Sequence, residues 1–318
     1  MFDINKRNLY GRIIPHPKPK SKGKFCMDTK KYQVFEKIVE LSSLTRAAES
    51  MGMTQSGVSH ILAGLEEEFG FPLLRRSRVG AQLTPEGERL MPAIREVLRA
   101  EEQLEQAVTD LRGLSAGTVR VATFTSVAVH WLPEMMTEFQ KLYPRVEFQL
   151  FNGDYHDVDR WLSDGSADVG FITVPTSLKC EYIPLREDRL LAVLPPDHPL
   201  AKLDVCPVKD VAREPFLSLL ETSDDDARRA LQSAGVTANV RFSTKDDYAI
   251  IAMVGKGMGV SIMPELLLRD VIGSYVVARP LDPPNSRMLA LAVPAGELAG
   301  PATRRFAEFV KDWVAKNG

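Results

Sequence analysis

The sequence predicts an α/β protein with an α-rich N-terminal domain, one long connecting helix, and a larger body made of two similar α/β halves. Three observations predict this class. Apolar residues recur at helical spacing over residues 31–111, and β-compatible runs alternate with helical segments over residues 118–293. A length of 318 residues allows two or three domains at roughly 100–200 residues each.

The charge of the chain is unevenly distributed. Residues 1–27 are rich in proline and lysine without periodicity, which predicts a disordered basic tail. Up to Thr84 the chain carries 14 Lys and Arg against 8 Asp and Glu, a net charge of +6; the remainder carries 26 against 34, a net charge of −8. A basic front end on an acidic body indicates that the front end binds a polyanion.

Neither a membrane span nor an export signal is recognisable in the sequence. No apolar run reaches the roughly 18 residues that a bilayer requires, and the N-terminus lacks an apolar export segment. We therefore expect a soluble, cytoplasmic protein without membrane contact.

Residues 28–84 are predicted to form three helices and a hairpin. The first helix covers residues 31–41, and two shorter stretches of apolar periodicity follow it. Residues that favour helix ends separate these stretches. They are Ser42 or Ser43 and Thr54 as N-caps, and Gly52 and Gly70 as helix ends. The segment "FPLLRRSRVGAQL" then predicts a small hairpin, or wing, that turns at Val79 and Gly80.

A long helix over residues 85–112 is predicted to connect the two parts of the chain. Thr84 is placed to cap it, and Pro85 suits its first position. Its apolar residues follow the alternating spacing of a coiled-coil seam. They are Leu90, Ile94, Val97, Leu104, Val108 and Leu111. A rod of roughly 40 Å with one apolar stripe requires a partner, and a second copy of the chain is the simplest one.

The body follows a linker at residues 113–118 and is predicted to fold as two lobes. We assign residues 118–188 and 292–318 to lobe I and residues 189–291 to lobe II. The predicted strands are 118–124, 146–151, 168–173, 189–194, 216–220, 239–243, 259–264 and 287–293. The predicted helices are 126–143, 155–163, 223–233, 246–254 and 303–315. Strand–helix alternation of this kind indicates parallel sheets with right-handed crossovers.

The second and third helices could be an ordinary helical hairpin or a helix-turn-helix that binds DNA. The N-terminal outer face of the third helix carries hydroxyl, amide and imidazole groups, which can read base edges, and none of them is acidic. Glu66, Glu67 and Glu68 come only at its far end. Arginines on the wing could neutralise phosphates. The candidate DNA-contacting residues are Gln55, Ser56, Ser59, His60, Arg46, Arg75, Arg76 and Arg78.

The stretch "LSSLTRAAESMGMTQSGVSHILAGLEEEFGFPLLRRS", followed by "LTPEGERL", resembles the winged helix-turn-helix of LysR-type transcriptional regulators. "FNGDYHDVDRWLSDGSADVGFIT", "LPPDHPLA" and "GKGMGVSIMP" are similar to the effector-binding domain of that family. Together they cover residues 28–318. Gly57, Ala63 and Gly64 depart from the family pattern, and the last two stand where Arg or Lys is frequent.

The resemblance implies a sequence-specific DNA-binding regulator that is not an enzyme and needs no cofactor. It also implies a type II periplasmic-binding-protein-like domain that holds a small-molecule effector between its lobes. The implied partners are promoter DNA, the effector, and further copies of the chain that pair through the linker helix into a homotetramer. RNA polymerase is a further candidate partner.

Ligands of open α/β domains bind beyond the carboxyl ends of the parallel strands. The polar residues at these strand ends are therefore the candidate effector contacts, although each one alone could be an ordinary helix cap. They are Thr125, Ser126, Asn152, Gly153, Asp154, Thr173, Glu221, Thr222, Lys245 and Asp246. Asp224, Asp225 and Asp226 either compensate a helix dipole or disfavour a purely anionic ligand.

A solute-binding protein or an enzyme built on the two-lobed body is the alternative hypothesis. A periplasmic binder would require an export signal, and an enzyme would require a convergent catalytic set; we find neither. Cys26, Cys180 and Cys206 lie too far apart for a zinc pattern. His156 between Asp154 and Asp157 is better explained as a solvated loop, so we expect no metal site.

Overall fold

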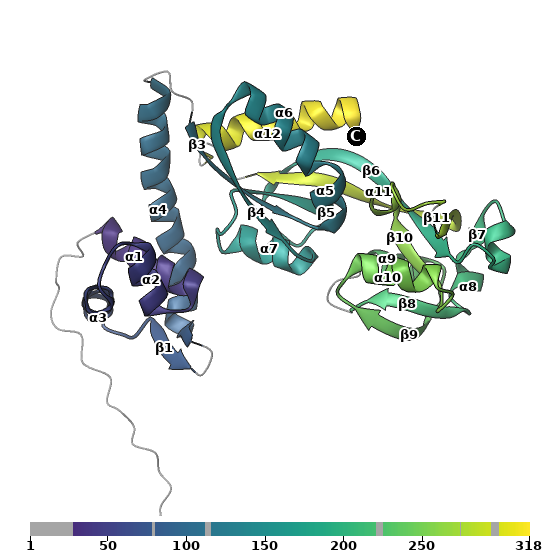
Figure 1. The fold of residues 1–318 in the computed structure, drawn as a ribbon, viewed down its shortest axis with the longest axis horizontal. Coiled ribbons are helices and arrows are strands. Elements are labelled where there is room, and N and C mark those ends of the chain that lie inside the picture. The colour runs from purple at the N-terminus through teal and green to yellow at the C-terminus, as the bar shows by residue number, and fades with distance from the viewer. Residues whose placement is uncertain (1–27, 78–79, 112–115, 221–224, 274, 294–298) are drawn as a thin grey trace, which may run out of the picture. The chain divides into compact units, whose positions relative to one another are not determined.

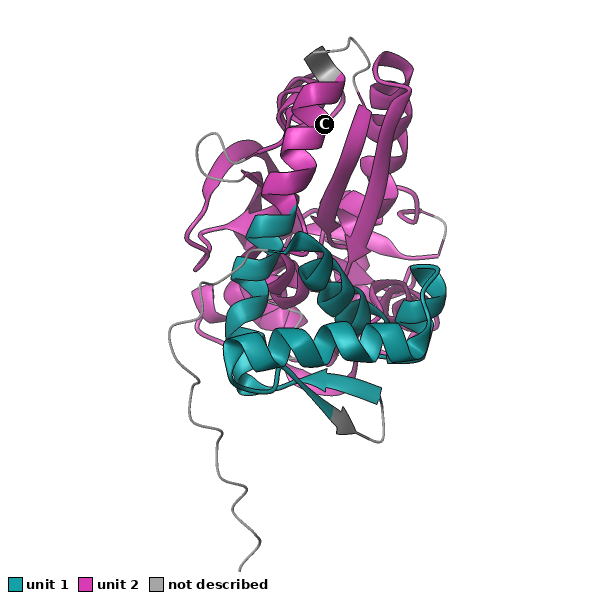
Figure 2. Ribbon diagram, turned by 90° about the vertical axis from the view of Figure 1, so that its left-hand side faces the viewer, with its two compact units in different colours: residues 1–98 teal, residues 99–318 magenta. Residues whose placement is uncertain are grey.

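The computed structural model describes residues 28–77, 80–111, 116–220, 225–273, 275–293 and 299–318. The chain divides into two compact units, residues 1–98 and residues 99–318, which Figure 2 distinguishes by colour. The predicted basic tail lies outside the described residues.

The first unit contains three helices, a two-stranded hairpin and the beginning of a long helix (Figure 1). These elements are α1 (Thr29–Leu41), α2 (Leu44–Ser50), α3 (Gln55–Phe69), β1 (Leu74–Ser77), β2 (Gly80–Leu83) and α4 (Pro85–Leu111). Local side-chain caps set their boundaries, as predicted: the Ser43 hydroxyl accepts a hydrogen bond from Arg46 N at 3.3 Å, and the Thr84 hydroxyl accepts one from Gly87 N at 3.0 Å.

One hydrophobic core holds the first unit together. Phe35 and Ile38 of α1, Ala47 of α2 and Val58 of α3 are fully buried in it. The first half of α4 closes this core, with Ile94 among the buried residues. The early positions of the predicted coiled-coil seam therefore lie inside this core, and only its later positions lie outside it.

The second unit is an α/β body of two lobes. Lobe I contains β3 (Ala116–Thr123), α5 (Thr125–His130), α6 (Leu132–Leu142), β4 (Arg145–Asn152), α7 (Tyr155–Ser163), β5 (Val169–Val174) and α12 (Pro301–Asn317). In Figure 1, α6 and α12 lie on one face of its sheet and α7 lies on the other. β3 pairs in parallel with both β4 and β5, as predicted from the strand–helix alternation.

Lobe II contains mainly short elements around two further apolar clusters. They are η1 (Pro199–Lys202), β7 (Cys206–Pro207), α8 (Val208–Val211), β8 (Pro215–Leu219), α9 (Asp225–Ser233), β9 (Asn239–Thr244), α10 (Asp247–Gly255), β10 (Ser261–Pro264) and α11 (Glu265–Leu268). β8 and β9 form a parallel pair, whereas β10 joins the large sheet.

Two long strands run through both lobes: β6 (Glu181–Leu194) and β11 (Val277–Val293). They pair with each other in an antiparallel register over most of their length, and the sheet order is β10-β6-β11-β5-β3-β4. Each strand begins earlier than the sequence pattern predicts, because its N-terminal part, residues 181–188 or 277–286, lacks the continuous apolar signal of a buried strand.

The single helix predicted over residues 126–143 is wrong: the structure has two helices there, α5 and α6, separated at Trp131. Pro133 occupies one of the first two positions of α6. A proline has no backbone N–H and disfavours the helical conformation in the residue before it, so it starts a helix better than it continues one.

Candidate nucleic-acid interface and ligand cleft

The N-terminal half of α3 presents its polar face to solvent. Gln55, Ser56 and His60 are exposed, and Ser59 is half-buried. The opposite face of the helix, which includes Val58, is buried in the core. The polar groups that could read base edges therefore lie outside the packed domain, as a recognition helix requires.

The first turn of α3 depends on Gly57. The Thr54 hydroxyl accepts a hydrogen bond from Gly57 N at 3.1 Å. A Cβ at position 57 would lie only 3.2 Å from that hydroxyl oxygen. Gly57, which departs from the family pattern, thus leaves room for the Thr54 hydroxyl that caps the helix. This space partly offsets the free-energy cost of ordering a glycine in a helix.

The glutamates at the C-terminal end of α3 have structural partners. The Glu66 carboxylate accepts hydrogen bonds from Leu73 N at 2.7 Å and from Leu74 N at 3.1 Å, and so holds the chain that enters the wing. Glu68 forms an ion pair with Lys31 of α1 at 3.0 Å. These acidic side chains bind within the domain and do not belong to the polar face at the start of α3.

The cationic candidates are spread over two elements. Arg46 on α2 and Arg75 on β1 are exposed. Arg76 lies in β1, whereas Arg78 lies outside the described residues. The wing is tied to the helices because Ala81 N donates to the carbonyl oxygen of Ser42 at 2.8 Å.

The second unit contains a cavity of about 230 Å³ where the lobes meet. Lobe I contributes the start of α5, the end of β4 and the start of α7; lobe II contributes α9, β10 and the start of α10. The predicted residues that line it are Thr125, Ser126, Asn152, Gly153, Asp154 and Lys245. Lys245 of lobe II lies 3.9 Å from the Asp154 carboxylate of lobe I, an ion pair between the lobes.

The other predicted contacts do not line this cavity. Thr173 lines a separate hollow beside α7. The Asp246 carboxylate is exposed and caps α10, accepting hydrogen bonds from Tyr248 N at 3.0 Å and Ala249 N at 3.1 Å. The neighbouring Asp247 lines the cavity instead. Glu221 and Thr222 lie outside the described residues.

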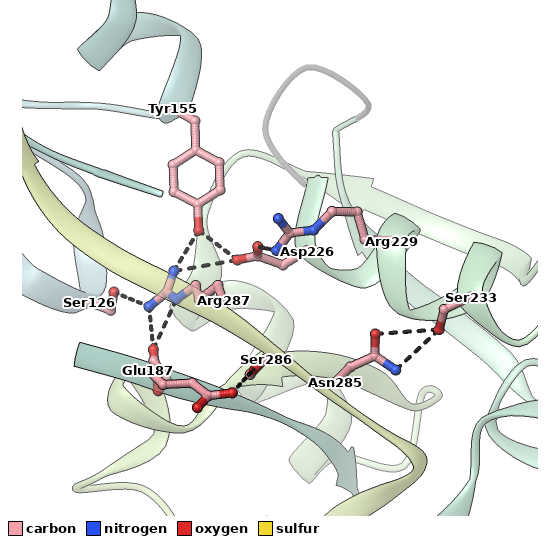
Figure 3. Close-up of polar contacts among 10 residues, drawn as sticks. Ser126, Tyr155, Glu187, Asp226, Arg229, Ser233, Asn285, Ser286 and Arg287 are labelled. Atoms are coloured by element: carbon pink, nitrogen blue, oxygen red, sulfur yellow. Dashed lines mark hydrogen bonds and ion pairs between the residues drawn. The ribbon is translucent and has the colours of Figure 1, made fainter. Parts of the chain in front are cut away.

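A buried arginine connects the two lobes inside the cavity. Arg287, on β11, exposes only 3% of its surface. Its guanidinium donates to the Asp188 carboxylate at 2.9 and 2.7 Å and to the Ser126 hydroxyl at 2.7 Å. On its other side it donates to the Tyr155 hydroxyl and lies 3.4 Å from the Asp226 carboxylate (Figure 3).

These contacts join α5, α7, α9 and β6 to Arg287 on β11. Ser126 and Tyr155 come from lobe I, Asp226 from lobe II, and Asp188 from the crossing strand β6. The Tyr155 hydroxyl donates to Asp226 at 2.6 Å, and Arg229 forms an ion pair with the same carboxylate at 2.6 Å. Any change in the angle between the lobes must rearrange this set.

Burial changes the acidity of groups in the cavity. Desolvation raises the pKa of Tyr155 well above its ordinary value, so the hydroxyl keeps its proton and donates to Asp226. Burial also raises the pKa of the Asp247 carboxyl, although a hydrogen bond with Thr125 opposes this shift. The cavity is lined by Asp154, Asp157, Asp226 and Asp247 against Lys245 and Arg287, so acidic groups predominate.

The sequence interpretation missed Arg287, Tyr155 and Asp247. Arg287 opens the predicted strand 287–293, and a charged residue at the start of an otherwise apolar strand is the signal that could have identified it. Tyr155 follows the predicted Asp154 directly. Asp226 belongs to the acidic run at the start of α9, and its 5% exposure and its contact with Arg287 show a role beyond compensation of the helix dipole.

The second half of α4 carries apolar residues on its surface. Leu104 is 67% exposed and Val108 is 39% exposed. Both belong to the predicted coiled-coil seam. The side chain of Leu111 lies outside the described part of the chain.

Among the described residues, no helix is long and apolar enough to cross a membrane. No group of three or more histidine, cysteine or acidic side chains that could hold a metal ion occurs in that same part of the chain.

Comparison with known proteins gives matches over nearly the whole described chain. Residues 29–88 match the family model described as a bacterial regulatory helix-turn-helix protein of the lysR family, and residues 112–315 match the LysR substrate binding domain. The HTH-type transcriptional regulator YvbU of Bacillus subtilis is 34% identical over 282 residues, which cover 88% of this chain and 96% of that protein.

Solved structures show the same fold. Full-length OxyR from Pseudomonas aeruginosa superposes with a TM-score of 0.74 at 20% identity, covering 92% of this chain and 95% of that one. The effector binding domain of QuiR in complex with shikimate superposes with a TM-score of 0.57 at 22% identity, covering 64% of this chain and 99% of that one.

Proposed function

Because the chain belongs to the LysR family of DNA-binding transcriptional regulators, we propose that α3 is its recognition helix and that the cavity between the lobes is its effector site. The proposed base contacts are Gln55, Ser56, Ser59 and His60, and the proposed phosphate contacts are Arg46, Arg75, Arg76 and Arg78. The exposed polar face of α3 carries this proposal. The alternative of an enzyme or a solute-binding protein is set aside by the family assignment.

The wing arginines are expected to act on every DNA sequence equally. Replacing Arg75 and Arg76 by alanine should weaken binding and flatten the slope of log K against log salt by about 1.8, since each neutralised phosphate contributes about 0.9. Gel-shift titrations of the full chain on DNA from upstream of its own gene, at several salt concentrations, measure this slope.

Ser59→Ala is the contrasting variant for the same titrations. It should keep the salt slope and lose discrimination at one base position, because it removes a proposed base contact and no phosphate contact. A slope that stays at the wild-type value in the arginine variant would rule out the wing as a phosphate contact.

The effector is proposed to bind where the lobes meet. The effector binding domain of QuiR was solved in complex with shikimate, and the interlobe cavity, at about 230 Å³, has room for a small molecule among polar side chains of both lobes. Thermal-shift screening of the full chain with small molecules tests the site, since a ligand raises the apparent stability by mass action. An authentic hit should lose its effect in Thr125→Val.

The second half of α4 is proposed to pair two copies of the chain, and dimers are proposed to associate further into a tetramer. Two copies would cover the exposed Leu104 and Val108 side chains. Leu104→Glu should therefore weaken dimerisation about a hundredfold or more, because the apolar contact is lost in both subunits. Analytical ultracentrifugation measures the dissociation constant.

Glu105→Gln, a change of one exposed residue in the same turn, is the control and should leave dimerisation unchanged. If the Leu104→Glu variant dimerised with the same dissociation constant as the wild type, the proposed coiled-coil seam would be disproved. Since the proposed ligand is promoter DNA, the proposed place of action is the cytoplasm, and RNA polymerase remains a candidate partner there.

A further inference from the structure

The interlobe cavity has more acidic than basic side chains on its wall. Among the described residues, its acidic lining groups are Asp154, Asp157, Asp226 and Asp247, and its basic ones are Lys245 and Arg287. A buried charge is tolerated when a partner of opposite sign compensates it. The class of ligand that the cavity accepts therefore depends on which of these groups lacks such a partner in the protein.

Three of the four aspartates are paired with basic side chains. The ion pairs are Asp154 with Lys245 at 3.9 Å, Asp157 with Arg160 at 2.5 Å, and Asp226 with Arg229 at 2.6 Å and with Arg287 at 3.4 Å. Arg287 also binds Asp188 at 2.7 Å. Both basic lining residues are thus paired with carboxylates of the protein, and an anionic ligand would have to compete with these carboxylates.

Asp247, at the start of α10 in lobe II, is the exception. It is half-buried, lines the cavity, and forms no ion pair with any residue in the described ranges. Desolvation by burial raises the pKa of its carboxyl, although a hydrogen bond with the Thr125 side chain of lobe I and the charge of Arg287 oppose this shift. A positive group beside Asp247 would complete the compensation of its negative charge.

Carboxylates of the protein also occupy two helix starts at the cavity. The amino end of a helix attracts anions through its free backbone N–H groups. At α7 the Asp154 carboxylate accepts a hydrogen bond from Asp157 N at 2.9 Å. At α10 the Asp246 carboxylate accepts hydrogen bonds from Tyr248 N at 3.0 Å and Ala249 N at 3.1 Å. An anionic ligand would therefore add negative charge at these helix starts without gaining the amides that the two aspartates already bind.

Two observations favour an organic cation over a metal ion in this cavity. Within the part of the chain that the structure describes, no group of three or more histidine, cysteine or acidic side chains could hold a metal ion. The half-buried apolar side chains of Leu219 and Pro264 line the cavity together with Asp247. An ammonium group on a carbon skeleton suits both surfaces, because its N–H groups donate to the carboxylate and its carbon atoms pack against the apolar side chains.

We propose that the effector is a small organic ammonium compound whose nitrogen binds between Asp247 of lobe II and Thr125 of lobe I, with its apolar part against Leu219 and Pro264. This proposal rests on the proposed function, because it assigns a ligand class to the same cavity. An ammonium group has three N–H donors, enough to bind the Asp247 carboxylate and the Thr125 hydroxyl oxygen together. Since these two groups come from different lobes, the bound ligand favours the arrangement in which the lobes are close.

Matched compounds that differ only in their polar group test the ligand class. One set is butylammonium, butanol and pentanoate, and the other is benzylammonium, benzyl alcohol and phenylacetate. Isothermal titration calorimetry of the full chain, at constant pH and ionic strength, measures the dissociation constant of each compound. In at least one set the ammonium compound should bind at least about tenfold more tightly than the alcohol and the carboxylate, since a charge-assisted hydrogen bond is stronger than a neutral one.

Asp247→Asn removes the proposed anionic partner and keeps a side chain of similar size that can still accept a hydrogen bond from Thr125. In this variant the ammonium compound and the alcohol should bind about equally. Asp204→Asn is the matched control, because it makes the same substitution at an exposed position of lobe II that is not among the lining residues. The preference for the ammonium compound should remain tenfold or more there, as in the wild type.

The proposal would be overturned if no ammonium compound bound, if the carboxylate bound as tightly as its ammonium counterpart, or if Asp247→Asn kept the preference for the ammonium compound. Thr125→Val separates this outcome from a failure of the proposed function. If a carboxylate bound most tightly and lost its affinity in Thr125→Val, the interlobe cavity would remain the effector site and only the ammonium class would be wrong.

Discussion

Replacing Arg287 by alanine is expected to lower the free energy of unfolding of residues 99–318 by about 3–5 kcal/mol. The guanidinium is the shared partner of Asp188 and Asp226, each only 5% exposed, and it also binds Ser126 and Tyr155. Without Arg287, the buried Asp188 carboxylate is left, among the described residues, with the Leu266 amide as its hydrogen-bond donor. A buried charge that loses its partner costs far more than a surface ion pair contributes.

Tryptophan fluorescence in urea measures this loss for one unit alone, because Trp131, Trp161 and Trp313 all lie within residues 99–318. The double variant Arg287→Ala with Asp188→Asn is the decisive control. Asparagine removes the orphaned charge and can still accept from Leu266 N, so the double variant should be more stable than Arg287→Ala. A double variant as unstable as the single one would show that the buried charge is not the cause.

Arg229→Ala offers a comparison within the same set of contacts. Arg229 forms an ion pair with Asp226 at the edge of the contacts around Arg287, where the Arg229 side chain is 37% exposed. Its loss should lower the free energy of unfolding by no more than about 1 kcal/mol, since solvent screens the pair and Asp226 keeps Arg287.

In the first unit, Gly87→Ala is expected to destabilise the DNA-binding domain by about 1–3 kcal/mol. Gly87 lies in the first turn of α4, where the helix packs against the chain that leads into the wing. A Cβ at this position would lie 2.3 Å from the backbone oxygen of Leu73 and 3.0 Å from the side chain of Leu83. The backbone oxygen is itself bonded to Thr84 N, so α4 must move away from the hairpin.

Gly64→Ala is the matched control, because the substitution is the same and also falls in a helix. A Cβ at position 64 would meet no atom within 4 Å, so this variant should stabilise the domain by about 0.5–1 kcal/mol. Hydrogen exchange of the α1 and α3 amides in the full chain measures both effects as local free energies of opening. Equal protection in the two variants would contradict the packing assigned to Gly87.

Much of the first unit could be predicted because its signals are local. Thr54 and Thr84 each cap a helix through a hydrogen bond to the residue three positions later, and Gly70 ends α3 with a φ of 83°. Such contacts can be predicted from the sequence because the two partners lie only three residues apart. The burial of Val58 can likewise be predicted from the spacing of apolar residues. The exposed positions of Gln55, Ser56 and His60 follow from the same spacing, since they lie on the opposite face.

The interlobe contacts could be predicted only in part. The rule that ligands bind beyond strand ends led to Thr125, Ser126 and Asp154, because each strand end is recognisable from its own segment. That rule says nothing about residues on strands that pass between the lobes, and Arg287 is one of these. Thr173, at the end of β5, lines a separate hollow beside α7 and not the interlobe cavity.

By itself, the sequence determined the helix boundaries of the first unit, the polar face of α3, the apolar stripe of α4 and the alternation of strands and helices in the body, since each depends on residues a few positions apart. Only the tertiary structure decided which buried charges meet. Ser126 and Tyr155 lie 161 and 132 positions from Arg287, and the periodicity that predicts burial carries no information about which polar partner a buried side chain will find. Folding of both lobes onto β6 and β11 brings these groups together, and their mutual neutralisation makes the burial tolerable.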